Sequence, residues 1–495
     1  MLPPASVWDA FAQRCAETPG ATAIVDERGH RVSWAELAAR VRARTAELAA
    51  AGVGPGSVVS WQLPSWIATA ELTLALAALG AVQNPIVPIL RDRDVAFITA
   101  QAGATHLVVP PTWRGHDYAA MAHDIAAGSA LRVLVLDRDA PPADAGRADA
   151  IAPMRDDGGV RWLFYTSGTT AEPKGARHAD AALLAAAGGL VAACGMGPGD
   201  RLGSPAPMSH IGGIAILVAI AIAGTTLLID EVFDPARTSA FFSAEDATLL
   251  GAGTPFFLAY LDAQATSATP LFPHVRCFLL GGAPKPPSLN AMMRERFGAP
   301  IVSGYGLTEC PMLAWNALGD ADDVLATTEG RAIEGVDLRV VDGEVRVRGP
   351  QLMAGYVDAA LDAEAFDDEG YLRTGDLGAL DAGGNLTITG RSKDVIIRNM
   401  ENVSAKEVED LLFLHADVAD CAVVGVPDAR VGERVCVAVV ARDPGAPPTL
   451  HDLCAHLDAQ QLSRRKHPEQ LQVMAALPRN GMGKVLKAEL REAFA

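Results

Sequence analysis

Cysteine is scarce in this sequence, with seven residues among 495. They are scattered at positions 15, 194, 277, 310, 421, 436 and 454, without a C-x-x-C pair and without histidines at the spacing of a zinc site. This distribution excludes a disulfide-stapled secreted scaffold and a structural zinc module. We therefore expect buried or free thiols in a reducing compartment.

Positive charge is also in short supply. The chain has 41 Lys and Arg residues against 59 Asp and Glu residues, a formal net charge of −18. Because nucleic acids attract basic surfaces, this balance argues against nucleic-acid binding as the main role. The opening residues, MLPPASVWDAFAQRCAE, lack a basic segment followed by an apolar one. We therefore expect no secretion signal and predict a cytoplasmic enzyme.

Long uncharged runs are rare as well. One segment, Ile211–Ile229, carries no charged residue and reaches the length of a membrane span. Gly212, Gly213 and the sequence Gly224-Thr225-Thr226 interrupt it. The interruptions predict a short helix and a buried strand, TTLLI, and no transmembrane segment.

The composition that is present is that of an ordinary globular protein, half hydrophobic and 20% charged. A chain of 495 residues suggests two to four domains. Up to about residue 310, predicted helices and strands alternate; for example, a capping box at Ser33 and Glu36 opens a helix that ends near Gly52, and the strand Val58–Leu63 follows. This alternation predicts an α/β fold with largely parallel sheets covered by helices.

The pattern changes after residue 331. Alternating strands around Asp342-Gly343 predict a hairpin, and the next turn, in LDAGGNLTITG, predicts another. A βαββαβ-like series follows Gly390, with a capped helix at Ser404 and another at Thr449. We predict an N-terminal core over 1–390 that includes a small antiparallel subdomain over 331–390, a hinge over 391–394, and a mobile α+β domain over 395–495.

A short loop after an apolar strand concentrates hydroxyls, glycine and a lysine. It is LFYTSGTTAEPKGA, residues 163–176. Hydroxyl donors, glycine amides and the charge of Lys174 suit a polyphosphate cradle. The common P-loop differs, because it places a hydroxyl residue directly after its lysine. The alternative reading is a Ser/Thr/Gly-rich surface loop.

Two more unusual loops follow predicted strands. The sequence GGAP at 281–284 follows a strand over 275–280, and SGYGLTE at 303–309 follows a strand over 300–302. Ligands of open α/β sheets bind beyond the carboxyl ends of the strands. The three loops therefore predict one cleft.

The run YTSGTTAEPKG resembles the phosphate loop of the adenylate-forming superfamily, which comprises acyl-CoA synthetases, firefly-type luciferases and adenylation domains. The motifs SGYGLTE, YLRTGD, GRSKD and PRNGMGKV follow in the superfamily's order, so the resemblance covers nearly the whole chain. It implies an ATP-dependent carboxylic acid:CoA ligase. Such an enzyme forms an acyl-adenylate and pyrophosphate, and then an acyl-CoA thioester.

The resemblance implies catalytic roles for three residues. Lys484 would bridge the carboxylate and the α-phosphate and neutralise charge in the transition state. Thr308 would bind phosphate, and Glu309 would hold Mg²⁺. A lysine on a loop is otherwise usually a solvated surface residue.

The same resemblance implies the nucleotide-binding residues. Asp376 would bind the ribose hydroxyls, Arg391 would contact the nucleotide, and Lys393 would be the pivot of the hinge. Tyr305 would contact adenine. The set is completed by Thr166, Ser167, Gly168, Thr169, Thr170, Lys174, Gly281, Gly282, Ala283 and Pro284.

The acid is expected in a pocket of small and apolar residues. His210 lies in PMSHIGG, which matches a segment that borders the acyl pocket in the family, and the pocket is completed by Gly212, Gly213, Thr254 and Gly304. The sequence GGAPKPP is similar to that of cyclohexanecarboxylate and short- to medium-chain acid ligases, which favours an alicyclic or medium-chain acid.

One departure from the family's pattern concerns the second step. Met400 stands where the family usually has a glycine near the path of the thiol, and Ala405 replaces a proline. A stand-alone adenylation enzyme that loads a carrier protein would share every motif and remains the alternative. A non-catalytic nucleotide-binding regulator is disfavoured because Lys484 and Glu309 are both present.

Overall fold

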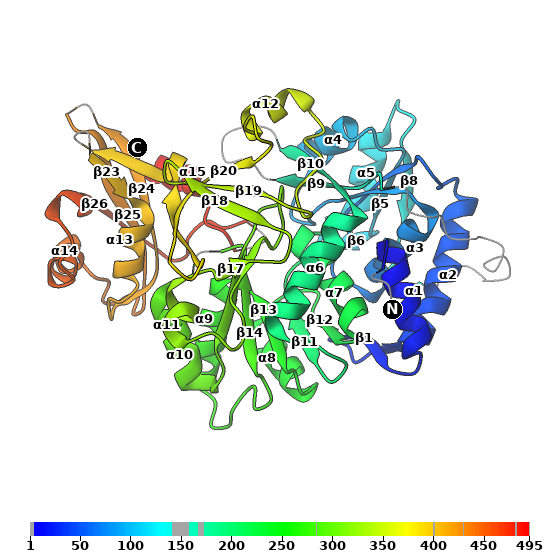
Figure 1. Cartoon of the computed structure of the whole chain (residues 1–495), viewed down its shortest axis with the longest axis horizontal. Helices are drawn as coiled ribbons and strands as arrows, with labels where there is room; N and C mark the ends of the chain where they lie inside the picture. The colour runs from blue at the N-terminus through cyan, green and yellow to red at the C-terminus, as the bar shows by residue number, and fades with distance from the viewer. Residues whose placement is uncertain are drawn as a thin grey trace.

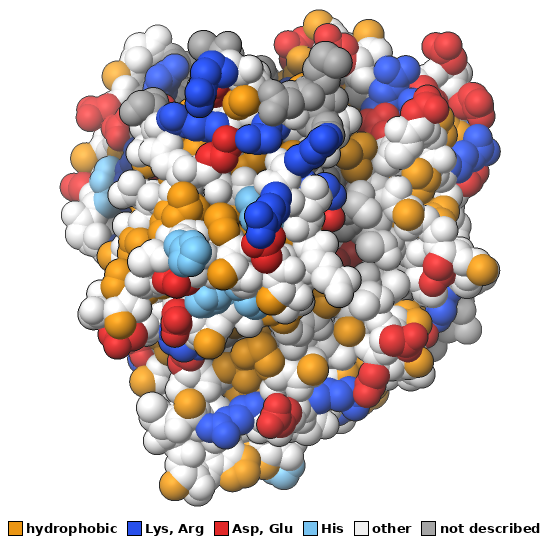
Figure 2. Space-filling model, turned by 90° about the vertical axis from the view of Figure 1, so that its left-hand side faces the viewer, with side chains coloured by type: hydrophobic (Ala, Val, Ile, Leu, Met, Phe, Trp, Pro, Cys, Tyr) orange, Lys and Arg blue, Asp and Glu red, His pale blue; other side chains and the backbone are white. Residues whose placement is uncertain are grey.

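A computed structural model describes residues 4–140, 158–166, 173–283, 285–398, 401–428, 430–480 and 483–494. In Figure 1 the blue N-terminal helices lie at one end of the molecule and an orange-to-red C-terminal unit lies at the other. Figure 2 views the side of that C-terminal unit, where Lys and Arg side chains are interspersed with Asp and Glu.

A nine-stranded sheet is the largest layer. Its strands, in sheet order, are β17 (Arg331–Ala332), β16 (Ala314–Trp315), β15 (Ile301–Tyr305), β14 (Cys277–Gly281), β13 (Leu249–Ala252), β11 (Arg201–Ser204), β12 (Thr226–Ile229), β1 (Thr22–Asp26) and β2 (Arg31–Ser33). The neighbours from β15 to β1 are parallel. Their carboxyl ends therefore lie at one edge of the sheet.

A six-stranded sheet forms the second large layer. Its strands, in sheet order, are β10 (Lys174–Ala179), β9 (Val160–Thr166), β4 (Val82–Pro85), β3 (Val58–Trp61), β5 (His106–Val109) and β8 (Arg132–Val135). Only β10 is antiparallel to its neighbour. A two-stranded ribbon, β6 (Thr112–Trp113) and β7 (His116–Asp117), lies beyond β5 in the chain.

Helices cover both sheets. The main core contains side chains of both sheets together with α1 (Val7–Glu17), α2 (Trp34–Ala50), α3 (Ile67–Leu79), α6 (Asp180–Cys194) and α7 (Ile211–Ala223), so these helices lie between the layers. The outer face of the nine-stranded sheet packs on α8 (Pro235–Ala244), α9 (Thr254–Ala265) and α10 (Pro287–Phe297). The outer face of the smaller sheet packs on α4 (Asp92–Gln101) and α5 (Tyr118–Ala126).

Several local predictions are confirmed. The Ser33 hydroxyl accepts from the Glu36 amide at 3.2 Å, and the Glu36 carboxylate accepts from the Ser33 amide at 2.8 Å, which completes the capping box of α2. The uncharged segment divides into α7 and β12, because Gly224 ends the helix with φ = 75°. Among the described residues, no helix combines the length and apolarity needed to cross a membrane. All seven cysteines are free, and five are buried.

One strand is longer than predicted. We expected Ser303-Gly304-Tyr305 in a loop, whereas β15 extends to Tyr305. Gly304 pairs with Gly281 of β14 on one side and with Trp315 of β16 on the other, and this double pairing keeps the segment extended. The three predicted site loops follow strands of two different sheets: the phosphate cradle follows β9 of the six-stranded sheet, and the other two loops follow β14 and β15 of the nine-stranded sheet.

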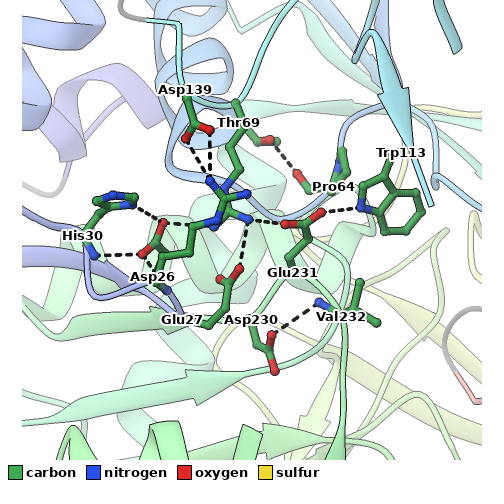
Figure 3. Close-up of polar contacts among 12 residues, drawn as sticks. Asp26, Glu27, His30, Pro64, Thr69, Trp113, Asp139, Asp230, Glu231 and Val232 are labelled. Carbon is green, nitrogen blue, oxygen red and sulfur yellow. Dashed lines mark hydrogen bonds and ion pairs between the residues drawn. The ribbon is translucent and has the colours of Figure 1, made fainter. Parts of the chain in front are cut away.

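A buried arginine joins the ends of three strands. Arg138 follows β8, and its guanidinium lies 3.0 Å from Asp26 and 2.9 Å from Glu27, at the end of β1. Figure 3 shows the side chains of Asp26, Glu27 and Glu231 gathered in one place. It also pairs with Glu231, which follows β12. The Arg138 side chain is only 8% exposed. This network ties the six-stranded sheet to the nine-stranded sheet.

A four-stranded antiparallel sheet follows, made of β18 (Asp337–Val341), β19 (Glu344–Arg348), β20 (Leu372–Leu380) and β21 (Leu386–Arg391). Asp342 and Gly343 form the predicted hairpin turn with φ of 52° and 82°. Positive φ at both positions is typical of the turn that matches strand twist. The short helices of this region are α11 (Asp322–Thr327), η2 (Ala359–Leu361) and α12 (Asp362–Ala365).

The C-terminal unit has its own sheet and core. It contains β22 (Val395–Arg398), β23 (Glu401–Ser404), β24 (Val418–Asp428), β25 (Gly432–Ala441), β26 (Gln470–Met474), α13 (Ala405–Leu412), α14 (Leu450–Ala459), η4 (Arg464–Lys466) and α15 (Lys487–Ala493). The turn η3 (Ser392–Asp394) connects it to β21. The division into 1–390, 391–394 and 395–495 stays a prediction.

Candidate active site

Tyr305, Asp376 and Arg391 meet at the end of β15. The Tyr305 hydroxyl donates to Asp376 Oδ2 at 2.6 Å, and the Arg391 Nε donates to Asp376 Oδ1. Asp376 and Arg391 face one another because β20 and β21 pair in that register. Asp376 is 2% exposed, and burial together with its negative charge raises the pKa of Tyr305 well above the usual value. Asp376 Oδ2 also accepts from Arg391 Nη2 at 3.3 Å, so Oδ1 is the oxygen that keeps a lone pair for a diol hydroxyl.

Thr308 and Glu309 lie in the turn after β15. The Glu309 carboxylate accepts from the Tyr356 hydroxyl at 2.8 Å. The Thr308 carbonyl accepts from His178 Nε2 at 2.8 Å, and burial lowers the pKa of His178 to about 4, so the ring is neutral. Both partners come from distant segments and hold the turn in place. Sequence analysis did not predict His178 or Tyr356.

The two ends of the predicted phosphate cradle are paired strands. Thr166 ends β9 and Lys174 begins β10, directly opposite one another. The Lys174 ammonium lies 5.6 Å from the centre of the Tyr356 ring, within cation–π range. Because Tyr356 also bonds to Glu309, the Lys174 end of the cradle is brought beside the Thr308–Glu309 turn. Four predicted cradle residues, Ser167, Gly168, Thr169 and Thr170, lie outside the described residues.

The Lys484 loop reaches the same site from the C-terminal unit; the red segment in Figure 1 runs toward the core. The Lys484 amide donates to Asn480 Oδ1 at 3.0 Å, which closes a tight turn in which Gly483 has φ = 79°. A Cβ at Gly483 would lie 3.3 Å from Pro255, so the loop contacts the start of α9. Gly481 and Met482, on the same loop, lie outside the described residues.

Lys484 has an unusual ionisation. Burial, together with the nearby cations Arg391 and Lys393, lowers its pKa to about 8, against the opposing charges of Asp376 and Asp394. The ammonium is therefore close to the Tyr305–Asp376–Arg391 cluster. Burial, followed by the charge of Arg391, also lowers the pKa of Lys393 in η3. Lys487 points elsewhere and pairs with Glu409 at 2.8 Å, as expected for a helix-face residue.

His210 caps the N-terminus of α7. Its Nδ1 accepts from the Gly212 amide at 3.1 Å, and burial lowers its pKa to about 4. The ring is therefore neutral and carries its proton on Nε2. It lines a cavity of about 30 Å³ together with Thr308 and Tyr165, room for about one water molecule.

The glycines of the predicted acid pocket differ in their surroundings. A Cβ at Gly213 would lie 2.4 Å from the Pro207 carbonyl, and one at Gly304 would lie 2.3 Å from the Trp315 ring. A side chain at either position would clash with these neighbours, so close packing within the protein explains why both residues are glycine. Gly281 has more room, because its nearest neighbour would be the Gly304 carbonyl at 3.9 Å. Gly281 ends β14 beside Gly304, and Gly282 and Ala283 follow it. Thr254 begins α9, and Pro284 lies outside the described residues.

Comparison with known proteins adds independent findings. The family model of the AMP-binding enzymes matches residues 11–357, and that of the AMP-binding enzyme C-terminal domain matches residues 407–484. The chain is 29% identical to a medium-chain fatty-acid–CoA ligase of Escherichia coli (strain K12), over 99% of this chain and 90% of the relative. It is 32% identical to a salicyl-AMP ligase / salicyl-S-ArCP synthetase of Mycobacterium tuberculosis (strain ATCC 25618 / H37Rv), over 93% and 85%. The crystal structure of ATP-bound MatB from Rhodopseudomonas palustris aligns with a TM-score of 0.88, 29% identity and 99% coverage of both chains.

Proposed function

The chain belongs to the AMP-binding enzyme family, and within it we propose an ATP-dependent carboxylic acid:CoA ligase. One observation carries the proposal. Tyr305, Asp376, Arg391 and Lys484 come from four separate segments and lie together, with the pKa of Lys484 lowered to about 8 by burial, Arg391 and Lys393. An aromatic ring, a carboxylate and two cations suit a base, a ribose diol and phosphates.

In the first half-reaction the acid's carboxylate attacks the α-phosphorus of ATP, and pyrophosphate leaves. We assign the ribose to Asp376, the adenine to Tyr305 and the Gly281–Ala283 loop, and the terminal phosphates to the cradle that ends at Lys174. Thr308 and Lys484 would hold the α-phosphate. The Lys484 ammonium would bridge the two reacting anions and neutralise the charge that develops between them.

Magnesium fits the residues that are present. Mg²⁺ usually takes one or two protein carboxylates together with substrate phosphates and waters. Glu309 offers one carboxylate, with Oε1 fixed by the Tyr356 hydroxyl. Among the described residues no group of three or more His, Cys, Asp or Glu forms a metal cage, which agrees with a metal held mainly by the nucleotide. When bound, the ion would reduce the negative charge of the triphosphate.

In the second half-reaction a thiol displaces AMP from the acyl-adenylate. Because Lys484 occupies the site in this arrangement, the C-terminal unit would have to move before the thiol enters. We assign the movement to residues 391–394, with Lys393 as the pivot. Met400, on the expected path of the thiol, lies outside the described residues.

The pocket favours an uncharged acyl group. His210 is neutral near pH 7, and the residues that line the cavity beside it carry no charge. We therefore propose an alicyclic or medium-chain acid, activated in the cytoplasm as part of fatty-acid or related acid metabolism. The medium-chain ligase relative supports this substrate class.

A second candidate is an adenylating enzyme that transfers its acyl group to a carrier protein. The salicyl-S-ArCP synthetase relative favours it. A pyrophosphate-release screen over a panel of carboxylic acids tests both candidates. Acid-dependent release that is followed by consumption of free CoA supports the ligase, whereas release without CoA consumption supports the carrier-loading enzyme. No release with any acid would contradict both.

A further inference from the structure

Lys285 is buried directly behind the loop assigned to the nucleotide. It follows Gly281–Ala283 in the chain, and only 4% of the residue is exposed. Its ammonium donates to the Ser303 hydroxyl at 2.6 Å, to the Thr328 carbonyl at 2.8 Å and to the Leu325 carbonyl. All three partners are neutral oxygens, so the charge is held by hydrogen bonds. Burying an ammonium costs free energy unless its N–H donors are hydrogen-bonded, and these three bonds satisfy the donors of Lys285.

The three partners belong to different parts of the site. Ser303 lies in β15, next to Gly304 and two residues before Tyr305. Leu325 and Thr328 lie at the end of α11, where backbone carbonyls lack partners within the helix. Lys285 therefore connects the end of β14, the end of β15 and α11.

The connection extends to the antiparallel sheet. Asn316 lies 2.8 Å from the Ser303 hydroxyl and 3.1 Å from the Thr328 hydroxyl, and both Ser303 and Asn316 are fully buried. Just beyond Thr328, the Glu329 amide donates to the Leu386 carbonyl at 2.7 Å. Leu386 begins β21, the strand that ends at Arg391. One polar network thus joins the Gly281–Ala283 loop to the strand that carries Arg391.

We propose that Lys285 is a positioning residue for the nucleoside part of the nucleotide. It fixes the Gly281–Ala283 loop relative to Tyr305 and to the strand of Arg391. This inference rests on the proposed function, because it assumes that the nucleotide binds at these residues. Loss of the ammonium would free the loop and lower nucleotide affinity, while the residues that act on the acid would keep their places.

AMP is the appropriate probe, because it carries the base, the ribose and one phosphate but not the terminal phosphates that the cradle and Mg²⁺ would hold. For Lys285→Met we expect about tenfold weaker AMP binding by calorimetry, the scale of one hydrogen bond to a charged group. The KM for ATP should rise by a similar factor, while kcat and the KM for the acid at saturating ATP stay within about twofold. A merely structural role would lower the active fraction and leave AMP affinity unchanged.

Two further variants complete the test. Ser303→Ala removes one acceptor and keeps the lysine, and it should weaken AMP binding about threefold; it decides the question if Lys285→Met does not fold. Lys466→Met is the matched control, because Lys466 pairs with Glu407 in the C-terminal unit, and AMP affinity should not change. Folded Lys285→Met or Ser303→Ala protein that binds AMP as tightly as the parent would overturn the inference. A parent that binds no AMP and releases no pyrophosphate would instead overturn the proposed function.

Discussion

We predict that Lys484, in its proposed role, makes the first half-reaction sensitive to alkaline pH. An ordinary lysine stays charged well above pH 9, but burial, together with Arg391 and Lys393, lowers the pKa of Lys484 to about 8. The ammonium would then be about nine-tenths populated at pH 7 and about one-tenth populated at pH 9. Because the charged form is the one that stabilises the transition state, activity is present below the pKa and lost as the pH rises through it. We expect kcat/KM for acyl-adenylate formation to fall about tenfold between those pH values.

Lys484→Ala isolates this effect. The variant should lose about 10²–10³-fold in acyl-adenylate formation, the scale of removing one preorganised charge donor, and its remaining activity should lack the decline near pH 8. Thioester formation from supplied acyl-adenylate should survive. Lys487→Ala is the control, because Lys487 pairs with Glu409 away from the site, and its pH profile should match the parent. The reasoning is refuted if Lys484→Ala keeps the alkaline decline or loses both half-reactions equally.

Three further variants probe other parts of the account. Tyr356→Phe removes the hydroxyl that donates to Glu309 at 2.8 Å and should raise the Mg²⁺ concentration for half-maximal adenylation about tenfold. Tyr371→Phe is the control, because the Tyr371 hydroxyl bonds to Asp337, and its Mg²⁺ dependence should match the parent. Equal Mg²⁺ dependence in the two variants would contradict the role of Tyr356. Lys393→Pro fixes φ near −65° and should impair one half-reaction far more than the other; parental ratios of the two rates would show that the pivot lies elsewhere. Arg138→Met leaves Asp26, Glu27 and Glu231 without their shared cation and should lower the unfolding free energy by about 3–5 kcal/mol in urea denaturation. An unchanged midpoint would mean that the network does not join the sheets.

Local rules predicted much of the fold. The capping box at Ser33 and the turn at Asp342-Gly343 depend only on neighbouring residues, and both form as predicted. The end of β15 was wrong by three residues. Its pairing with Gly281 and with Trp315 is a long-range property that short sequence windows do not contain.

In the candidate site, too, local motifs were predicted and long-range contacts were not. Motif residues such as Tyr305, Asp376 and Arg391 were predicted from the resemblance, and the fold brings them into hydrogen-bonding contact. The residues that hold the site together were not predicted. Tyr356 reaches Glu309 across 47 residues of sequence, and Lys285 reaches Thr328 across 43. A tyrosine after a glycine and a lysine between prolines carry no pattern that reveals such partners.

The central claim is that one active site makes an acyl-adenylate and then an acyl-CoA. The most direct measurement is a two-stage single-turnover reaction followed by mass spectrometry, with an acid chosen by its pyrophosphate release. Without CoA, the account predicts enzyme-bound acyl-adenylate and one pyrophosphate per active site. Addition of CoA should then convert the adenylate to acyl-CoA and AMP. An adenylate that persists in the presence of CoA would contradict the ligase assignment, and the absence of any acyl-adenylate would contradict the account as a whole.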